Sequence, residues 1–369
     1  MEVDNMNLTT TERVLQAMRE QGLTQMILSD PVAIYYLTDR WIFPGERLLA
    51  LYLNTNGNHC LVINELFPQQ SDPDLRFVWY NDIQDGVEIL RQQICATEPL
   101  GIDKTWRAGF LLHLQELHGA VSYVNGSEIL DRVRQIKTPD EQEKMRISSR
   151  MNDEVMEELI PWVTKGLTEK ELEQKACQIY QDHGFEDVSF TPITAYGKNA
   201  ADPHHNNDST LGSYGDCVVL DIGGMKDCYA SDMTRTVFLG EASPKAVEIY
   251  NIVKEANLRG IAAAKPGARM CDVDLACRNY ITEMGYGPYF THRTGHSIGL
   301  EDHEAGDVSS VNEAIIRPGQ CFSVEPGIYL PEEGIGVRIE DLVLITETGC
   351  EVLNHFTKEL IVVPMSPEQ

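Results

Sequence analysis

The sequence predicts an α+β protein of two domains, in which the second domain is a duplicated unit of two helices and a hairpin. Three observations support this fold class. The chain has 369 residues, which is more than one ordinary domain needs. Its first 130 or so residues alternate between short apolar runs and helical patterns, and the remainder shows one series of elements twice. We expect the domains at 1–135 and 136–369.

The N-terminal domain is expected to be a small α/β domain. A helical pattern, TTERVLQAMREQG, ends at Gly22. Two further helical stretches, GVEILRQQIC and AGFLLHLQELHG, flank PLGIDKT. Four short apolar runs bounded by turn residues are typical of strands: TQMILS, LLALYLN, HCLVIN and RFVWYN. The domain carries no phosphate-loop or dinucleotide-binding fingerprint.

The C-terminal domain begins with a clearly marked helix. Thr138 precedes Pro139 and an acidic first turn, a combination typical of a helix start. The first set of elements is two helices, at about 139–164 and 168–184, and a strand pair within 216–239. The second set is two helices, at about 243–263 and 271–285, and a strand pair within 320–346. The order of elements is the same in both sets, which indicates an internal duplication.

Composition excludes several classes of function. The net charge is −27, from 57 acidic and 30 basic residues, whereas nucleic-acid binding requires a basic surface. No run of about 18 apolar residues occurs, so no membrane span is expected. The N-terminal segment lacks the pattern of a signal peptide, and we expect a cytoplasmic location. Nine cysteines without a CxxC pair are expected to be reduced, mostly buried thiols, not nucleophiles.

Each expected hairpin of the C-terminal domain carries two acids on strands that are otherwise apolar. If Lys226-Asp227 is the centre of the first turn, Asp221 and Asp232 lie directly opposite each other. The midpoint between Glu325 and Glu340 falls in the turn sequence PEEG, so these two are also opposed. Opposed like charges are destabilising, and buried unpaired carboxylates are costly.

Two explanations of these four acids remain open from the residues alone. The acids are solvated or capped by Arg235 and Arg338, or they bind a pair of divalent cations. The second explanation accounts for both hairpins together, because carboxylate-bridged metal pairs are a common hydrolytic device. Ligation rich in oxygen favours Mn²⁺ or a similar ion. The residues themselves thus predict a dinuclear metallohydrolase.

The segment THRTGHSIGLEDHE, residues 291–304, offers three histidines to such a site: His292, His296 and His303. Its glycines make a helix unfavourable and it lacks an HExxH pattern, so we do not expect an independent zinc site. His204, in the turn-rich NAADPHHNND, precedes the first hairpin. The remaining histidines are expected to have structural or surface roles: His59, His113, His118, His183, His205 and His355.

The motifs DPH, LDIGG, SDMTRT, HRTGHSIGLEDHE, SVEPGIY and GVRIED occur in this order. Together they resemble the metal-dependent pita-bread peptidases, and among these the Xaa-Pro dipeptidases (prolidases) and Xaa-Pro aminopeptidases. The resemblance covers essentially the whole chain, and it implies a creatinase-like N-terminal domain beside a pita-bread catalytic domain. It also implies two divalent metal ions, Mn²⁺ in preference to Co²⁺ or Zn²⁺, with Asp221, Asp232, His296, Glu325 and Glu340 as ligands.

The resemblance assigns roles to these ligands and to further residues. Asp232 and Glu340 would bridge both metals, and Glu325 would also be the general acid or base. His204 and His303 would hydrogen-bond the substrate and stabilise the tetrahedral intermediate. Two other residues would line the proline-side pocket or hold the substrate carboxylate, His292 and Arg338. Arg47, in RWIFPGERLLAL, matches a segment that a partner subunit projects toward the active site, which implies a homodimer.

Two residues depart from the family pattern. Ser297 stands where the family usually has glycine, whose backbone freedom serine lacks. Asp302 stands where the family often has an apolar residue, and we expect it to raise the pKa of His303 or to alter the pocket.

The predicted activity is the hydrolysis of Xaa-Pro dipeptides. One alternative is an Xaa-Pro aminopeptidase that acts on longer proline-containing peptides. Another is a non-catalytic binding protein on the same fold, which the complete set of ligands disfavours.

Overall fold

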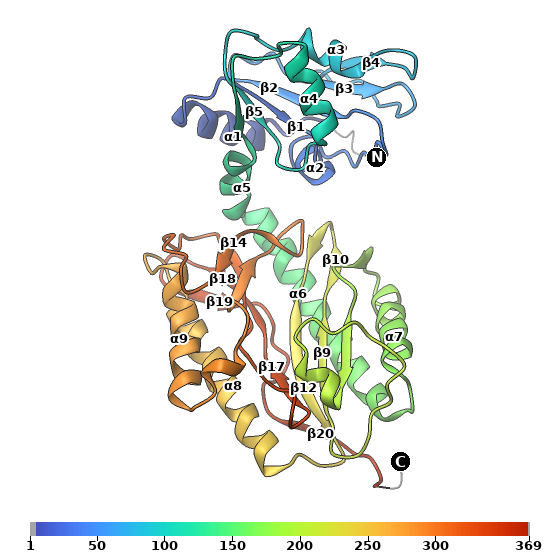
Figure 1. Cartoon of the computed structure of the whole chain (residues 1–369), viewed down its shortest axis with the longest axis vertical. Coiled ribbons are helices and arrows are strands. Elements are labelled where there is room, and N and C mark those ends of the chain that lie inside the picture. Colours follow the sequence, from blue (N-terminus) through green and yellow to red (C-terminus); the bar gives the residue numbers. More distant parts are fainter. Residues whose placement is uncertain (1–4, 368–369) are drawn as a thin grey trace. The chain divides into compact units, whose positions relative to one another are not determined.

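The computed structural model describes residues 5–367, and the chain forms two compact units, Met1–Arg134 and Gln135–Gln369 (Figure 1). The first four residues of the segment expected to lack a signal peptide lie outside the described residues. No helix in the described part of the chain has the length and apolar character needed to cross a membrane. The nine cysteines are free thiols.

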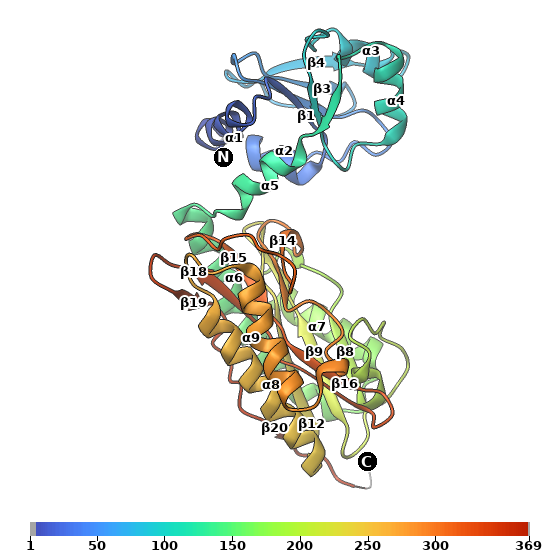
Figure 2. The same cartoon turned by 60° about the vertical axis from the view of Figure 1, so that its left-hand side comes forward.

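The N-terminal unit is an α/β domain built on a mixed six-stranded sheet (Figure 2). The strands lie in the order β4 (Arg76–Tyr80), β3 (Cys60–Asn64), β2 (Ala50–Asn54), β1 (Gln25–Leu28), β5 (Leu100–Ile102) and β6 (Tyr123–Asn125). The helices are α1 (Leu8–Glu20), α2 (Pro31–Thr38), α3 (Gly86–Arg91), α4 (Ala108–Glu116) and α5 (Ser127–Gln135). Helices α3 and α4 bury Val87, Leu90 and Leu114 against one face of the sheet.

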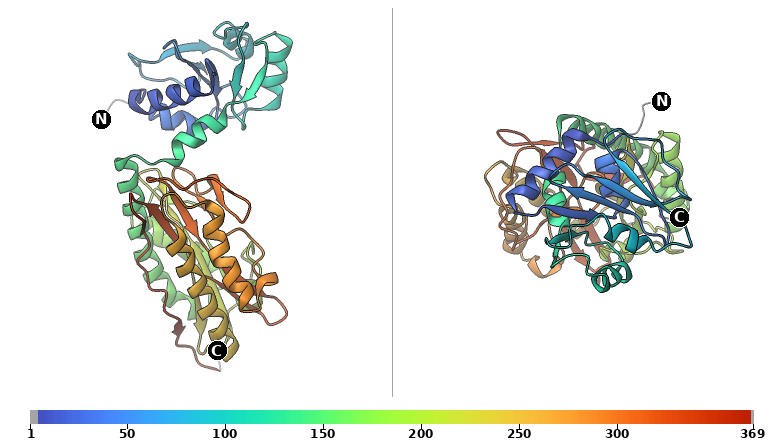
Figure 3. Two further views of the ribbon diagram at one scale, coloured as in Figure 1. Left: turned by 90° about the vertical axis from the view of Figure 1, so that its left-hand side faces the viewer. Right: turned by 90° about the horizontal axis from the view of Figure 1, so that it is seen from above.

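Two helix pairs enclose the strands of the C-terminal unit (Figures 1 and 3). Helices α6 (Pro139–Leu159) and α7 (Glu169–Asp182) form the first pair, and α8 (Pro244–Ala263) and α9 (Met270–Glu283) form the second. Short 3-10 helices occur at Ile160–Thr164 (η1), Gly197–Ala201 (η2) and Gly287–Tyr289 (η3). The predicted duplication of two helices and a hairpin is therefore confirmed.

The first helix of each pair begins in the same way. Thr138 caps α6 through a capping box with Glu141, and Pro139 is the first helical residue. Ser243 caps α8 by accepting a hydrogen bond from the Ala246 amide, and a proline again follows. These caps fix both helix starts locally.

Up to residue 367, the strands of the C-terminal unit form four sheets. Four strands pair in the order β20 (Ile361–Val363), β12 (Met233–Leu239), β9 (Cys217–Ile222) and β8 (Ile193–Tyr196). Five strands pair in the order β14 (Glu304–Val308), β13 (Gly295–Ser297), β15 (Cys321–Val324), β18 (Asp341–Ile345) and β19 (Cys350–Val352). The small sheets are β11 (Tyr229–Ala230), β10 (Gly224–Lys226) and β7 (Asp187–Val188), and the pair β16 (Gly327–Leu330) and β17 (Ile335–Arg338).

Strand β9 presents its alternate side chains to two different cores. Val218, Leu220 and Ile222 pack in the core beneath α6 and α7. Val219 packs on the other face, in the core shared with α8, α9 and the second hairpin. Because side chains alternate along a strand, Asp221 faces the same side as Val219. This carboxylate is thus directed between the two halves of the unit.

The register of the first hairpin differs from the predicted one. Strands β9 and β12 pair Asp221 with Thr234, so the prediction that Asp221 lies directly opposite Asp232 is wrong. The physical reason lies in the turn, whose central residues Asp227 (φ 49°) and Cys228 (φ 65°) are both left-handed. Two such residues make a type I′ turn, which matches the twist of a hairpin. Its centre is one residue further along the chain than assumed.

The register of the second hairpin is as predicted, and both hairpins are interrupted at acids. Pairs β15–β18 and β16–β17 share one register, in which Glu325 corresponds to Glu340. Both residues fall in the gap between the two ladders. The ladder of the first hairpin is likewise interrupted between β9–β12 and β10–β11, at Gly223 and Asp232.

Candidate active site

The site residues expected in the C-terminal unit line one cavity of about 420 Å³. The two interrupted hairpins supply the carboxylates, and segment 291–304 supplies three imidazoles. The lining residues are Phe190, Ile193, Pro203, His204, Asp221, Asp232, His292, Arg293, His296, Asp302, His303, Glu325, Arg338 and Glu340. Residues more than 100 positions apart in the sequence therefore form a single pocket.

His296 directs an unprotonated nitrogen at two carboxylates. Its Nδ1 lies 3.2 Å from the Ser297 carbonyl oxygen, so Nδ1 carries the proton that this oxygen accepts. The opposite nitrogen, Nε2, lies 3.5 Å from Asp232 Oδ2 and 3.5 Å from Glu325 Oε1. Burial lowers the pKa of His296 to about 4, so the ring is neutral. Three electron-pair donors thus face one another.

Two carboxylate oxygens in this cluster are buried and lack a hydrogen-bond partner among the described residues: Asp232 Oδ1 and Glu340 Oε1. Both side chains are almost completely buried. Burial and the neighbouring carboxylates raise the pKa of Asp232 and of Glu340 well above the usual range. Burial also raises the pKa of Glu325 to about 7. Unpaired buried acids at this density are unfavourable without a cation.

Thr234 and Arg338 connect Asp221 to Glu340. Thr234 Oγ1 lies 2.9 Å from Asp221 Oδ1 and 2.7 Å from Glu340 Oε2, and it accepts a hydrogen bond from Arg338 Nε at 3.1 Å. A hydroxyl has one proton, so it donates to only one of the two acids at a time. Arg338 Nη2 forms an ion pair with Asp221 Oδ2 at 2.6 Å.

The donor set fits divalent metal ions. Ligand atoms of Asp232, His296 and Glu340 lie within 4.8 Å of one another, and all three residues are buried. The unpaired carboxylate oxygens and the His296 Nε2 electron pair are the groups that such ions bind. Asp221 and Glu325 line the same cavity.

Asp302 and His303 form a pair at the wall of the cavity. His303 Nδ1 lies 2.7 Å from Asp302 Oδ2, and the two imidazoles of His303 and His296 lie 3.9 Å apart between ring centroids. The hydrogen bond to Asp302 is the main cause of a raised pKa of His303, which confirms the expected effect of this acid. Because Nδ1 is bound to Asp302, the opposite nitrogen of His303 is available for a substrate.

Ser297 fits its position without backbone strain. It lies in strand β13, and the non-glycine residues with positive φ in the described chain are Asp39, His118, Asp227 and Cys228. The register of β13 shifts between His296 and Ser297, which indicates a bulge next to the imidazole. The conformational freedom of glycine is therefore not needed here.

His292 is held by a chain of hydrogen bonds that starts at Arg338. Arg338 Nη1 donates to the Tyr329 hydroxyl at 3.1 Å, and that hydroxyl lies 2.8 Å from His292 Nε2. His292 Nδ1 lies 2.7 Å from the Arg293 carbonyl oxygen, so Nδ1 carries the proton and Nε2 accepts from Tyr329. Burial lowers the pKa of His292 to about 3. A neutral imidazole with a fixed orientation results.

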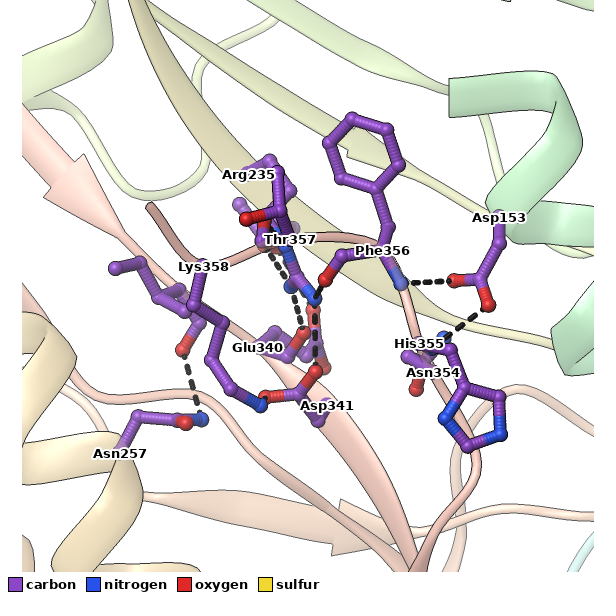
Figure 4. Close-up of polar contacts among 12 residues, drawn as sticks. Asp153, Arg235, Asn257, Glu340, Asp341, Asn354, His355, Phe356, Thr357 and Lys358 are labelled. Carbon is purple, nitrogen blue, oxygen red and sulfur yellow. Dashed lines mark hydrogen bonds and ion pairs between the residues drawn. The ribbon is translucent and has the colours of Figure 1, made fainter. Parts of the chain in front are cut away.

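Arg235 fixes the backbone of the second hairpin (Figure 4). Its Nη1 donates to the Glu340 carbonyl at 2.6 Å, and its Nη2 forms an ion pair with Asp341 at 2.8 Å. Asn354 Nδ2 donates to the Asp232 carbonyl at 3.2 Å. Of the two arginines proposed as caps, Arg338 thus pairs with a site carboxylate, whereas Arg235 pairs with Asp341.

Arg47 lies in the N-terminal unit and is engaged there. It pairs with Asp82 through Nε and Nη2, both at 2.8 Å, and Nη1 lies 2.9 Å from Glu46. It also lines a cavity of about 390 Å³ together with Phe43 and Trp106.

His205, expected to have no catalytic role, belongs to a separate polar cluster. Its Nε2 lies 2.7 Å from Glu169 Oε2, and Glu169 also accepts hydrogen bonds from the Tyr196 amide and Asn199. Asp208 completes the group. The carboxylate of Glu169 is therefore satisfied by protein donors.

Thr234 and Tyr329 are site residues that the sequence analysis missed. Thr234 follows Asp232 by two positions in SDMTRT, and Tyr329 follows Glu325 by four positions in SVEPGIY. Thr234 and Tyr329 each lie in a motif that also contains a proposed metal ligand, and this proximity in the sequence could have identified them. Their partners lie on other strands, which a motif does not indicate.

The fold and the site define a two-domain metallopeptidase. Residues 143–347 match the family model "Metallopeptidase family M24", and residues 11–136 match "Creatinase/Prolidase N-terminal domain". An uncharacterized peptidase of Staphylococcus aureus is 33% identical over 360 residues, which cover 95% of this chain and all of that protein.

Two solved structures illustrate the likeness over the whole fold. A recombinant prolidase from Thermococcus sibiricus is 30% identical, with a TM-score of 0.89 over 97% of this chain and 99% of that chain. An X-Pro aminopeptidase from Thermotoga maritima is 26% identical, with a TM-score of 0.80 over 94% of this chain and all of that chain. The chain belongs to metallopeptidase family M24, with a creatinase-like N-terminal domain and a pita-bread catalytic domain. Membership of this family implies a dinuclear metal site.

Proposed function

We propose that the chain is an Xaa-Pro dipeptidase that uses two divalent metal ions, with Mn²⁺ as the working metal. The observation that carries the proposal is the group of mutually facing electron-pair donors described above, which includes two buried carboxylate oxygens with no partner among residues 5–367. The proposed metal ligands are Asp221, Asp232, His296, Glu325 and Glu340. Asp232 and Glu340 are the proposed bridging ligands.

The metal ions would supply polarisation of the scissile carbonyl and a water of lowered pKa. Glu325 is the proposed general acid and base, because it lines the cavity and its position in SVEPGIY matches the one that has this role in the family. His303 and His204 are the proposed hydrogen-bond donors to the substrate and to the developing oxyanion. Asp302 fixes the orientation of His303 through Nδ1.

The proposed proline side of the pocket is the wall formed by His292 and Arg338. The three guanidinium nitrogens of Arg338 already donate to Asp221, Thr234 and Tyr329, so its proposed role is to hold this wall and to orient His292. Proline has no backbone N–H and a fixed φ, so a pocket that recognises the ring suits it.

An Xaa-Pro aminopeptidase is the second candidate, because an aminopeptidase is among the structures with the same two-domain fold. The two activities share their chemistry and differ in the space available beyond the proline. A non-catalytic binding role is a weaker candidate, since all five proposed ligands are present in one cavity.

We also propose a cytoplasmic homodimer in which Arg47 contacts the substrate in the active site of the partner. Support comes from its position in RWIFPGERLLAL. Light scattering after size exclusion measures the assembly. Mixing Arg47→Ala protein with inactive Asp232→Asn protein tests the contact, because mixed dimers would contain one site with both wild-type residues. Activity that stays at the level of the separate variants counts against the contact.

The decisive experiment compares hydrolysis of Ala-Pro with hydrolysis of Ala-Pro-Ala-Ala, each with and without Mn²⁺ or Co²⁺. We expect metal-dependent cleavage of the dipeptide and little cleavage of the tetrapeptide. Efficient cleavage of the tetrapeptide would support the aminopeptidase instead. Absence of metal from protein prepared in Mn²⁺ would support the binding role.

A further inference from the structure

Two buried asparagines occupy equivalent positions in the two halves of the C-terminal unit. Asn152 lies 13 residues after Pro139, the first residue of α6, and Asn257 lies 13 residues after Pro244, the first residue of α8. Neither side chain is exposed to solvent. Since the two helices are related by the internal duplication, the same side chain occurs at the same point of both repeats.

Each asparagine donates a hydrogen bond to a hairpin carbonyl at the interruption of the ladder. Asn152 Nδ2 lies 3.1 Å from the carbonyl oxygen of Ile222, the residue that follows Asp221. Asn257 Nδ2 lies 2.8 Å from the carbonyl oxygen of Val324, which precedes Glu325.

Asn257 spans both strands of the second hairpin. Besides its bond to Val324, Nδ2 lies 3.4 Å from the carbonyl oxygen of Ile339, which precedes Glu340. Figure 4 shows this amide directed from its helix toward the hairpin that carries Glu340. One amide group thus contacts the backbone beside two acids.

Both side-chain amides have the same orientation. In each half of the unit the Nδ2 donor points to the hairpin. The Asn152 side-chain oxygen accepts a hydrogen bond from the Tyr180 hydroxyl, whereas Asn257 Oδ1 is buried without a partner in the described part of the chain. An unpaired buried oxygen is unfavourable for folding, so the favourable polar contacts of the Asn257 side chain are those of its donor end. These contacts go to the two strands that carry Glu325 and Glu340.

We propose that Asn152 and Asn257 are equivalent positioning residues, which hold the interrupted hairpins so that the carboxylates meet around the metal ions. The inference rests on the proposed function, because it requires the metal ligands named above. Ile222 and Val324 are the last paired residues of their ladders before each gap. Ile339 lies in the second gap opposite Pro326, which has no N–H to donate, so Asn257 supplies a donor there. Groups that orient ligands from outside the coordination sphere affect metal affinity strongly.

The test uses full-length protein with Asn257→Leu or Asn152→Leu, since leucine preserves the shape but removes the donor. Tyr250→Phe on α8 is one matched control, because its buried hydroxyl bonds to the carbonyls of Lys358 and Glu359. Tyr196→Phe on β8 is the other, because its buried hydroxyl bonds to the carbonyl of Val163. Both controls remove a buried hydrogen bond that is not beside a proposed ligand.

The measurements are calorimetric titration of metal-free protein with Mn²⁺, the electron paramagnetic resonance spectrum of the Mn²⁺ pair, and circular dichroism to verify folding. We expect both asparagine variants to fold and to bind Mn²⁺ roughly 10–100-fold more weakly with an altered spectrum. Both controls are expected to retain the wild-type affinity and spectrum.

Three results would overturn the inference: wild-type Mn²⁺ affinity in the folded Asn257→Leu protein, equal weakening in the controls, or misfolding of both asparagine variants beside folded controls. Weakening in only one of the two asparagine variants would overturn their equivalence. Failure of the wild-type protein to bind two Mn²⁺ ions would instead refute the proposed metal centre itself. The two failures are therefore distinguishable.

Discussion

Thr234 offers a direct way to perturb the carboxylate cluster without touching a proposed ligand. Its hydroxyl contacts Asp221, Glu340 and Arg338, and the side chain is fully buried. Thr234→Val keeps the shape of the side chain but removes one donor and one acceptor. Arg338 Nε and one carboxylate oxygen then lose a partner in the interior.

The expected size of the effect follows from these contacts. An unsatisfied buried partner costs about 1–3 kcal/mol, so we expect the free energy of unfolding to fall by about 2 kcal/mol. For a unit the size of Gln135–Gln369, each kcal/mol lowers Tm by roughly 2–4 °C, which predicts a fall of roughly 4–8 °C. Because Asp221 and Glu340 lose a group that orients them, Mn²⁺ should bind roughly 10–100-fold more weakly.

Scanning calorimetry with and without Mn²⁺ measures Tm, and calorimetric titration measures the affinity. Thr194→Val is the matched control, because Thr194 is equally buried and its hydroxyl donates only to the Glu169 carbonyl at 2.8 Å. We expect it to lower Tm but to leave Mn²⁺ affinity unchanged. The reasoning is refuted if Thr234→Val protein binds Mn²⁺ as the wild type does, or if Thr194→Val weakens binding as much.

Three further outcomes are expected. Asp232→Asn should abolish hydrolysis and lower the metal content together, as measured by metal analysis; retained activity would exclude Asp232 as a bridging ligand. His303→Ala should leave the metal content unchanged and lower kcat, and loss of metal would make His303 a ligand. Asp302→Val should lower kcat by about tenfold while metal remains bound. A charge-assisted hydrogen bond contributes about 1.5–3 kcal/mol, and we take the lower end because the His303 side chain is 60% exposed; an unchanged kcat would show that Asp302 does not position His303.

The sequence predicted the parts of the fold that local signals specify. Thr138 with Pro139 marks the start of α6, and the prediction of that helix depends only on neighbouring residues. The register of the second hairpin also followed from local sequence, because the turn in PEEG is centred where its composition indicates. Long helices, and turns rich in proline and glycine, are specified largely by their own local sequence.

The first hairpin shows where local inference stops. Its turn places Cys228 in the left-handed region, which is uncommon for cysteine and which the sequence does not indicate. Because the turn centre was predicted one residue too early, Asp221 was assigned to Asp232, whereas its partner in the structure is Thr234. The contacts of Asn257, Arg235 and Tyr329 were also unpredictable, because each joins elements that are distant along the chain.

The cavity lies between the two repeats of the C-terminal unit and is lined by residues of both. Asp221 and Asp232 belong to the first repeat, whereas Glu325 and Glu340 belong to the second, so neither repeat holds a complete set of acids. A metal ion bound by acids of both repeats would act as a cross-link between the halves. It would stabilise only the arrangement in which these acids meet. The halves also share a hydrophobic core and the pairing of β12 with β20. In a chain cut between the repeats, metal would therefore be expected to tighten the association of the two pieces, not to be required for it.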